Sequence, residues 1–375
     1  MIVGIDASRA NRIKKTGVEW YSYYLIEELK KLTENSAHQF FLYTDRPLHG
    51  ELARLPKNWQ EKILKWWPKY LWTKIRFSWE MLRRKPDVLF IPSHTMPSFY
   101  PKKTVITIHD LGYERYPEAY SRFARNYLRK NYKFAARHAA KIIVPTEFTK
   151  RELIALYGTK PERIEVVHLA YDDKTFKPVE DEVKIDEVLK KYKIKKPYLL
   201  FVGRLETKKG LRTLLEAFAL ISNNSITNNL PDLSLVLVGG RGYGYNDLKP
   251  LISNLKSNIH ELGHLQNEED RVSLCAGTTG FIVPSLYEGF GIPVLEAMAC
   301  GVPVIASDIE SLKEVGGDCV QFFKVGNAED LAKKIKEVLA NQELRQKMIT
   351  TGLERVKNFF WQKCAEKTLK VLESI

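Results

Sequence analysis

The chain has 375 residues, of which 44% are hydrophobic and 28% are charged, and this composition is typical of a globular protein. A chain of this length exceeds one ordinary hydrophobic core, so two domains are expected. The formal net charge is +14. No run of eighteen apolar residues occurs, so no transmembrane helix is expected.

The first half of the chain predicts a parallel α/β domain. Met1 is followed directly by a buried strand, so no secretory signal peptide is expected and the protein should stay in the cytosol. Apolar, β-branched runs then alternate with helical stretches, which is the pattern of a doubly wound sheet. The predicted strands cover Ile2–Asp6, Gln39–Tyr43, Val88–Ile91, Val105–His109, Lys141–Pro145 and Ile164–Val167.

Basic and aromatic residues are concentrated in this half. Residues 1–178 hold 33 Lys and Arg against 19 Asp and Glu, an excess of 14, whereas the remainder balances at 26 against 26. The stretch from Lys62 to Lys85, here called the basic aromatic segment, interleaves two kinds of side chain. Its aromatic residues are Trp66, Trp67, Tyr70, Trp72, Phe77 and Trp79, and its basic residues include Lys65, Lys69, Lys74, Arg76, Arg83 and Arg84.

Two interpretations of the basic aromatic segment stay open. Aromatic side chains with basic partners suit the headgroup layer of an anionic membrane. Alternatively, the tryptophans belong to the core and the lysines form a solubilising rim. Nucleic acid is not expected as a partner, because no recognition motif accompanies the charge. A second basic series predicts one face of a helix, with Arg122, Arg125, Arg129, Lys133 and Arg137 at three- and four-residue spacing.

The second half predicts another α/β domain, after a polar, lysine-rich junction from Asp172 to Pro197. We expect the first domain to span residues 1–178 and the second to span residues 185–358. From Ala328 the pattern is helical to the end, with a break near Asn358. The predicted strands cover Tyr198–Val202, Ser234–Gly239, Ile259–Leu262, Phe281–Val283, Val302–Ser307 and Cys319–Phe322.

The most informative motif lies in residues 284–307. A short strand ends before a turn that contains Gly289, Phe290 and Gly291, and Pro293 suits the first turn of a helix. Glycines let the backbone approach a ligand closely, and the positive end of a helix favours an anion such as a diphosphate. The motif therefore predicts a strand, a ligand-binding loop and a helix.

Two carboxylates accompany this turn. Glu288 lies in the loop and Glu296 lies about one turn inside the helix, so they address different parts of one elongated ligand. The arrangement, with the strand that follows it, resembles the signature of retaining glycosyltransferases of the GT-B fold, family four. This resemblance implies that Glu288 contacts the transferred sugar and Glu296 contacts the ribose of the nucleotide. In the simpler reading, the glycines form a tight turn and both glutamates are solvated.

The resemblance extends to the segment from Tyr198 to Gly210. It implies that Arg204 and Lys209 clamp the donor diphosphate, where negative charge accumulates as the glycosidic bond breaks. Lys208 is the neighbouring alternative to Lys209. Surface cations before a helix are the simpler reading of this segment.

The first half offers two further matches to the same family. In relatives a glycine before the first helix approaches the donor phosphates, which makes Gly17 the candidate here. His109 and Asp110 follow a predicted strand, and ligands bind at the carboxyl ends of parallel strands. In family members with this pair, the histidine faces the sugar, so the resemblance assigns that contact to His109. Asp110 is the alternative base. A structural histidine with satisfied hydrogen bonds remains the other reading.

The resemblance also implies an architecture and a donor. Two Rossmann-like domains should face a cleft, with residues 360–375 crossing back to pack on the first domain. The context of His109–Leu111 and Tyr116–Glu118 looks like mannosyl- and related transferases of bacterial surface polysaccharide assembly. GDP-mannose is therefore the first expected donor and a UDP-hexose the second, with a saccharide or a lipid-linked saccharide as acceptor.

No metal and no cofactor are expected, because no Asp-x-Asp pair stands at a strand end and the four cysteines lack paired spacing. Retention of configuration without an evident enzyme nucleophile favours front-face transfer through an oxocarbenium-like state. A GT-B sugar-nucleotide epimerase and a non-catalytic sugar-nucleotide-binding membrane scaffold are the alternatives. The expected location is the cytoplasm, including a peripheral position on the inner face of the cell membrane.

Overall fold

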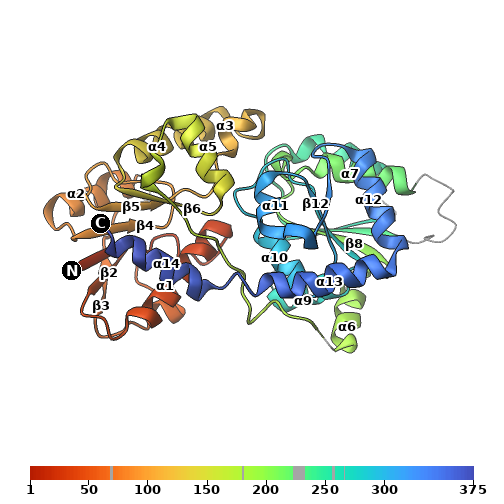
Figure 1. Ribbon diagram of the computed structural model, residues 1–375, viewed down its shortest axis with the longest axis horizontal. Helices are drawn as coiled ribbons and strands as arrows, with labels where there is room; N and C mark the ends of the chain where they lie inside the picture. Colours follow the sequence, from red (N-terminus) through yellow and green to blue (C-terminus); the bar gives the residue numbers. More distant parts are fainter. Residues whose placement is uncertain (68–70, 180, 223–232, 256–257, 266) are drawn as a thin grey trace. The chain divides into compact units, whose positions relative to one another are not determined.

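The computed structural model describes residues 1–375 except 68–70, 180, 223–232, 256–257 and 266. The chain divides into two compact units, each of which is a parallel sheet covered by helices (Figure 1). The first unit comprises residues 1–114, 122–170 and 359–375, and the second comprises residues 115–121 and 171–358. The expected α/β class, with two Rossmann-like sheets, is confirmed.

The sheet of the first unit has, in the described part of the chain, seven parallel strands in the order β3-β2-β1-β4-β5-β6-β7. The strands are β1 (Ile2–Asp6), β2 (Gln39–Thr44), β3 (Trp59–Ile63), β4 (Val88–Ile91), β5 (Thr104–Thr107), β6 (Lys141–Val144) and β7 (Ile164–Val166). Central strands such as β4 are buried along their whole length, because helices cover both faces of a parallel sheet. The winding direction changes between the neighbours β1 and β4.

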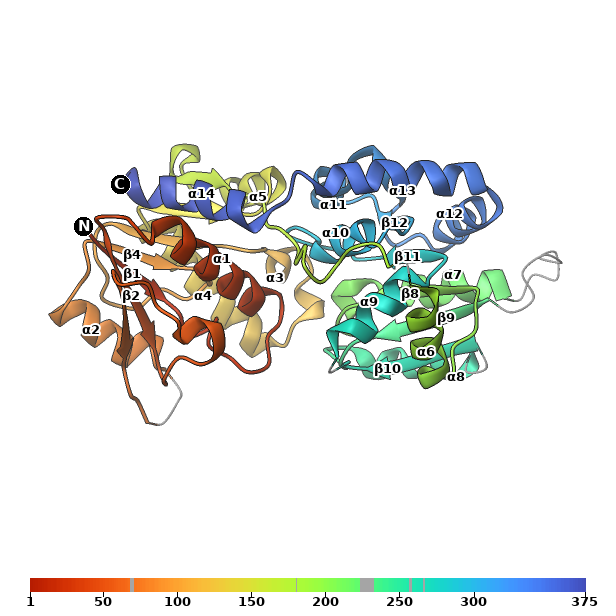
Figure 2. The same cartoon turned by 90° about the horizontal axis from the view of Figure 1, so that it is seen from below.

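Helices lie on both faces of this sheet (Figure 2). They are α1 (Gly17–Thr33), α2 (Ser78–Arg83), α3 (Gly112–Arg115), α4 (Arg122–His138), α5 (Glu147–Tyr157) and α14 (Trp361–Glu373). The C-terminal helix α14 packs against α1, where the rings of Tyr24 and Trp361 stack with centroids 5.3 Å apart. The expectation that the last helix returns to the first domain is therefore confirmed.

The second unit repeats the same winding with six described strands in the order β10-β9-β8-β11-β12-β13. The strands are β8 (Tyr198–Val202), β9 (Ser234–Val238), β10 (Ile259–Gly263), β11 (Gly280–Val283), β12 (Val304–Ser307) and β13 (Gln321–Phe323). The helices are α6 (Glu182–Tyr192), α7 (Leu211–Ser222), α8 (Lys249–Asn254), α9 (Glu268–Ala276), α10 (Ile292–Ala299), α11 (Glu310–Gly316), α12 (Ala328–Ala340) and α13 (Gln342–Val356). The direction of winding changes between the neighbours β8 and β11.

Some predicted strands needed correction. The strand β3 was missed because its sequence, Trp-Gln-Glu-Lys-Ile, is mostly polar, as an edge strand permits. The strand β12 begins at Val304 rather than Val302, because the amide of Val302 donates to the carbonyl of Ala297 instead. The strand β5 ends at Thr107, so His109 lies in the loop beyond it.

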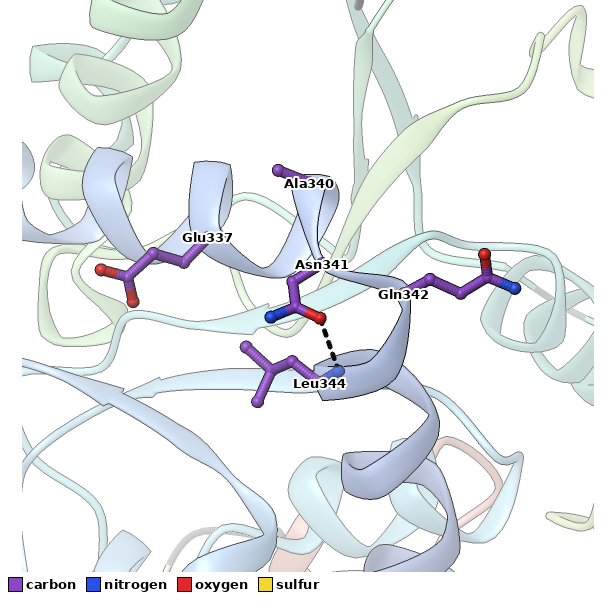
Figure 3. A pocket seen from close by; sticks show the side chains of 5 residues that line it. All are labelled: Glu337, Ala340, Asn341, Gln342 and Leu344. Atoms are coloured by element: carbon purple, nitrogen blue, oxygen red, sulfur yellow. Dashed lines mark hydrogen bonds between the residues drawn. The ribbon is translucent and has the colours of Figure 1, made fainter.

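The helical run after residue 328 is interrupted at Asn341 as well as before α14. Asn341 has extended backbone angles, and its Oδ1 accepts a hydrogen bond from the amide of Leu344 at 2.9 Å, which caps α13 (Figure 3). Glu337, Ala340 and Gln342 complete the lining of a surface hollow at this elbow. The hollow contains none of the residues that the sequence selected.

Candidate functional site

The residues selected in the second unit gather at the point where the winding of its sheet changes. The strands β8 and β11 are neighbours, and the loops after them hold residues 203–210 and 284–291. In open α/β sheets, ligands bind outside the carboxyl ends of strands at such a switch point. We call these two loops the donor loops.

Gly210 allows the two donor loops to touch. Its φ is +65°, and a Cβ at this position would lie 1.8 Å from the carbonyl oxygen of Pro284. A backbone hydrogen bond of 2.9 Å from the amide of Leu286 to the carbonyl of Lys208 joins the loops. Both the left-handed backbone and the close approach require glycine.

This contact brings two of the predicted residues together. The Nζ of Lys209 lies 2.5 Å from Oε1 of Glu288, and the hydroxyl of Ser285 donates to the same oxygen at 2.7 Å. Burial alone would raise the pKa of Glu288, but Lys209, Lys208 and the two hydrogen bonds hold that pKa below its ordinary value. Glu288 is thus a largely enclosed carboxylate, 12% exposed, that a cation keeps ionised.

The other cations of the first donor loop take different positions. Arg204 is 63% exposed, and its Nε lies 3.5 Å from Oε2 of Glu206. The Nζ of Lys208 lies 5.8 Å from the ring centroid of Tyr120. Lys209 therefore contacts Glu288 directly, Lys208 lies near enough to lower the pKa of that carboxylate, and Arg204 is the more open of the two expected diphosphate ligands.

The second donor loop leads into α10 through Phe290 and Gly291. Phe290 is buried, whereas Gly291 caps the helix with a φ of +107°. A Cβ on Gly291 would lie 2.4 Å from Cδ2 of Leu312, so this glycine too is required by its surroundings. Gly289 stands between Glu288 and Phe290 at the start of the turn.

Glu296 lies inside α10 and is 14% exposed. Its Oε1 is 3.5 Å from Nη2 of Arg271, a residue of α9 that the sequence reading did not select. Burial raises the pKa of Glu296, and Arg271 opposes this effect. No sequence pattern connects the two residues, because they lie on separate helices 25 positions apart.

The residues selected in the first unit also lie near a switch point, in loops after β1 and β5. His109 is largely buried, with its ring 4.7 Å from that of Tyr21 and its Nε2 3.3 Å from the carbonyl oxygen of Pro92. Burial lowers the pKa of His109. The Oδ1 of Asp110 accepts from the amide of Gly112 at 3.0 Å.

Gly17 is the first residue of α1, and a Cβ built on it meets no atom within 4 Å. Glu19 forms the capping box of this helix with Thr16 and also binds Arg9, with Nη1 3.1 Å from Oε1. His94, in the loop after β4, is a further titratable group that the sequence reading missed. Burial, with Arg9 and His109 nearby, lowers the pKa of His94 to about 4.

The basic aromatic segment divides between surface and core. Trp72 and Phe77 are buried and their rings stack, so the core interpretation holds for these two. Trp67 is 87% exposed and Trp79 is 53% exposed. Lys69 and Tyr70 lie outside the described residues.

An exposed apolar row accompanies these two tryptophans. Ile75, Trp79 and Leu82 lie in the helical residues 73–83, and Leu71 precedes them. The four recur at three- and four-residue spacing, and all are exposed. The exposed basic residues around them are Lys65, Arg83, Arg84 and Lys85. Lys74 differs from these, because its Nζ donates to the carbonyl of Met96 at 2.8 Å.

The second basic series lies on α4, as expected, but its members are not equivalent. Arg122, Lys133 and Arg137 are exposed. Arg129 is partly buried, and its Nε lies 2.8 Å from Oε1 of Glu114. Only part of the predicted face is therefore available to an anionic partner.

Two further features, a metal site and a membrane-spanning helix, are absent from the described residues. Those residues contain no group of three or more His, Cys, Asp and Glu side chains arranged to hold a metal ion. None of the helices in the same part of the chain combines the length and apolarity needed to span a bilayer.

Family comparisons cover most of the chain. Residues 15–175 match a family model described as Glycosyltransferase Family 4, and residues 184–355 match one described as Glycosyl transferases group 1. The chain is 29% identical to the O-antigen chain mannosyltransferase B of Escherichia coli, over 78% of this chain and 76% of that protein. It is 28% identical to the N,N'-diacetylbacillosaminyl-diphospho-undecaprenol alpha-1,3-N-acetylgalactosaminyltransferase of Campylobacter jejuni, over 65% of this chain and 63% of that protein.

Solved structures share the fold over the whole chain. Sucrose-phosphate synthase from Thermosynechococcus elongatus matches with a TM-score of 0.74 and 19% identity, over 100% of this chain and 98% of that one. Anabaena Alr3699/HepE, solved with UDP and glucose, also matches with a TM-score of 0.74, at 18% identity over 100% and 99% of the two chains. At such low identities these likenesses concern the fold alone.

Proposed function

The chain belongs to the glycosyltransferases of family 4 and group 1, and we propose that it moves a hexose from a nucleotide-sugar to a saccharide or a lipid-linked saccharide with retention of configuration. The observation that carries this proposal is the partly buried pair of Lys209 and Glu288 at the switch point of the second sheet. The cation of Lys209 suits the diphosphate of the donor. The ionised carboxylate of Glu288, 2.5 Å away, suits the hydroxyls of the sugar.

In this proposal the second unit binds the donor. Arg204, Lys209 and the amides that follow Gly289 neutralise the diphosphate, whose charge grows as the glycosidic bond breaks. Glu288 accepts hydrogen bonds from the transferred sugar, and Glu296 accepts them from the ribose. The cations supply the charge that a divalent metal provides in other enzymes, so the proposed reaction needs none.

In this proposal the first unit binds the acceptor and also contacts the donor. His109 contacts the sugar, and the open space around Gly17 leaves room for the donor phosphates. The carbonyl of Pro92 can only accept a hydrogen bond, so a neutral His109 that donates to it through Nε2 presents Nδ1 as an acceptor. We propose front-face transfer, in which a departing diphosphate oxygen takes the acceptor proton and Asp110 is the alternative base.

The relatives guide the choice of donor and acceptor. A mannosyltransferase of O-antigen chains favours GDP-mannose as the first donor, with a UDP-hexose as the second. A relative whose name contains a diphospho-undecaprenol group favours a lipid-linked acceptor. We further propose that the exposed row of the basic aromatic segment rests on an anionic membrane at the inner face of the cell, since Trp67 and Trp79 are exposed among basic side chains.

A donor panel tests the proposal. Nucleotide release from GDP-mannose, UDP-glucose and UDP-N-acetylglucosamine is measured with and without saccharide and lipid-linked acceptors, and the anomeric configuration of the product is read by NMR. We expect release that depends on the acceptor and a product of retained configuration. Release with a free sugar product and no acceptor would indicate an epimerase, and binding without any release would indicate a non-catalytic scaffold.

A further inference from the structure

Arg271 lies between two acidic side chains on the donor side of the second unit. Its Nη2 is 2.5 Å from Oε2 of Glu268, three positions earlier on α9, and 3.5 Å from Oε1 of Glu296 on α10. Arg271 is 24% exposed and Glu296 is 14% exposed, whereas Glu268 is 48% exposed. One guanidinium therefore links a solvated carboxylate to the enclosed carboxylate of Glu296.

An aromatic ring holds the guanidinium in place. The Cζ of Arg271 lies 4.7 Å from the ring centroid of Phe176, which is 2% exposed. Phe176 belongs to a turn after β7, in which its amide donates to the carbonyl of Asp172 at 2.8 Å. Because a planar guanidinium stacks on an aromatic face, this ring limits the directions in which Arg271 can point.

The charges around Glu296 act in opposite directions. Burial, followed by Glu268 and Asp172, raises the pKa of Glu296, and Arg271 lowers it. Cys275, also on α9, is a free thiol whose own pKa is raised by its hydrogen bond to Cys300, by burial and by Glu296. Among these groups, Arg271 is the one that favours an ionised carboxylate at this position.

We propose that Arg271, stacked on Phe176, is a positioning residue of the donor site that keeps the Glu296 carboxylate ionised and directed at the ribose hydroxyls. The inference rests on the proposed function, since it assigns Glu296 to the ribose. An ionised carboxylate accepts two hydrogen bonds from neighbouring hydroxyls, and such charged hydrogen bonds are stronger than neutral ones. Donor affinity then depends on a residue of α9 that does not touch the transferred sugar.

The sign of the pH dependence follows from these charges. Donor affinity is full above the pKa of Glu296 and falls as the pH drops through that pKa. Loss of Arg271 removes the charge that lowers the pKa, so affinity should be lost at a higher pH. Loss of the Glu268 charge removes a like charge, so affinity should be lost at a lower pH.

Calorimetric titration with GDP-mannose, and with UDP-glucose as a second probe, tests this from about pH 5 to about pH 8. The diphosphate of each probe is esterified at both ends, so the probe itself does not titrate in this range. We expect Arg271→Met to weaken binding about tenfold at neutral pH and to move the loss of binding to higher pH. Glu268→Gln should move the loss to lower pH, and Arg271→Lys, which keeps the charge but not the planar group on Phe176, should move it back only part of the way to the wild-type pH.

The outcomes separate this inference from the proposed function. Opposite displacements for Arg271→Met and Glu268→Gln support it, because a general loss of folding cannot produce both. If the wild-type chain binds a probe and both variants keep its pH dependence, the role of Arg271 is wrong while the donor site stands. If the wild-type chain binds neither probe at any pH, the proposed function fails and the inference with it.

Discussion

The two units share one winding pattern but differ in what they expose. The first carries 33 Lys and Arg against 18 Asp and Glu, and the second carries 26 against 27. Among the described residues, twelve of the fifteen exposed large hydrophobic side chains also belong to the first unit. The excess positive charge and the exposed apolar area therefore coincide on one unit.

The second unit uses its charges differently. Two pairs of largely enclosed charges lie there, with Lys209 beside Glu288 and Arg271 beside Glu296, whereas Arg204 is exposed. Paired, enclosed charges orient a small ligand, whereas scattered, exposed charges attract a large anionic surface. Under the proposed function, one topology serves donor binding in one unit and membrane attachment in the other.

The strongest test of this division removes the charge of Glu288. Glu288→Gln keeps the size of the side chain but takes away the carboxylate that Lys209 faces, so we expect transfer activity to fall about 10²- to 10³-fold. The measurement is steady-state nucleotide release with the best donor and acceptor. The matched control is Glu165→Gln in the first unit, which breaks a Lys141–Glu165 pair of similar length, 2.6 Å.

The control variant should keep nearly full activity, because exposed ion pairs contribute little. Equal losses in Glu288→Gln and Glu165→Gln would break the comparison, since the loss of activity would then not be specific to the carboxylate that Lys209 faces. Thermal unfolding of both variants confirms that each is folded under the assay conditions.

A pair of glycines tests how strongly the donor loops are joined. Gly210 and Gly158 have nearly the same φ, +65° and +62°. A Cβ added to Gly210 would lie 1.8 Å from a backbone oxygen, whereas a Cβ added to Gly158 would meet no atom within 4 Å. We expect Gly158→Ala to lower the free energy of unfolding by about 1 kcal/mol, the cost of the left-handed backbone. Gly210→Ala should lower it by about 3 kcal/mol or more, because the collision adds to that cost.

Chemical denaturation measures both glycine variants. Gly210→Ala should also weaken donor binding, because the contact that brings Lys209 to Glu288 cannot form unchanged. Equal destabilisation by the two variants would show that the donor loops tolerate separation. It would contradict the expectation that the close contact at Gly210 stabilises the second unit.

The smallest expected effect concerns attachment. Replacing Trp67 and Trp79 by Ser removes exposed aromatic area, so the fraction that sediments with anionic vesicles should fall several-fold. Replacing Val183 and Leu220 by Ser removes exposed apolar area from the second unit and should leave sedimentation unchanged. If the Trp67 and Trp79 double variant sediments as the wild type does, the functional contrast between the two surfaces is lost.

Charge reversal of Lys65 and Arg84 complements the tryptophan variants. Each lost cation near an anionic surface weakens attachment by about 1 kcal/mol at low salt, and the effect should shrink as salt screens it. Lys74 is unsuitable for this purpose, because its contacts with Met96 and the ring of Phe134 lie inside the first unit.

Much of the fold followed from local patterns. Apolar runs such as Val88–Ile91 and Tyr198–Val202 form strands where they were predicted, since strands buried on both faces need continuous apolar sequence. Polar edge strands lack that signal, and β3 was therefore missed. The turn at Gly291 and the helix that includes Pro293 were also predicted correctly, because their backbone requirements are local.

The sequence by itself determined the two α/β domains, the loop that carries Glu288, the helix that carries Glu296 and the asymmetry of charge. Only the tertiary structure decided that Lys209 meets Glu288, that Arg271 meets Glu296, and that Trp67 and Trp79 are exposed while Trp72 is buried. Composition and periodicity describe residues that are neighbours along the chain. These contacts depend instead on which separate loops and helices the sheet brings within a few ångströms of one another.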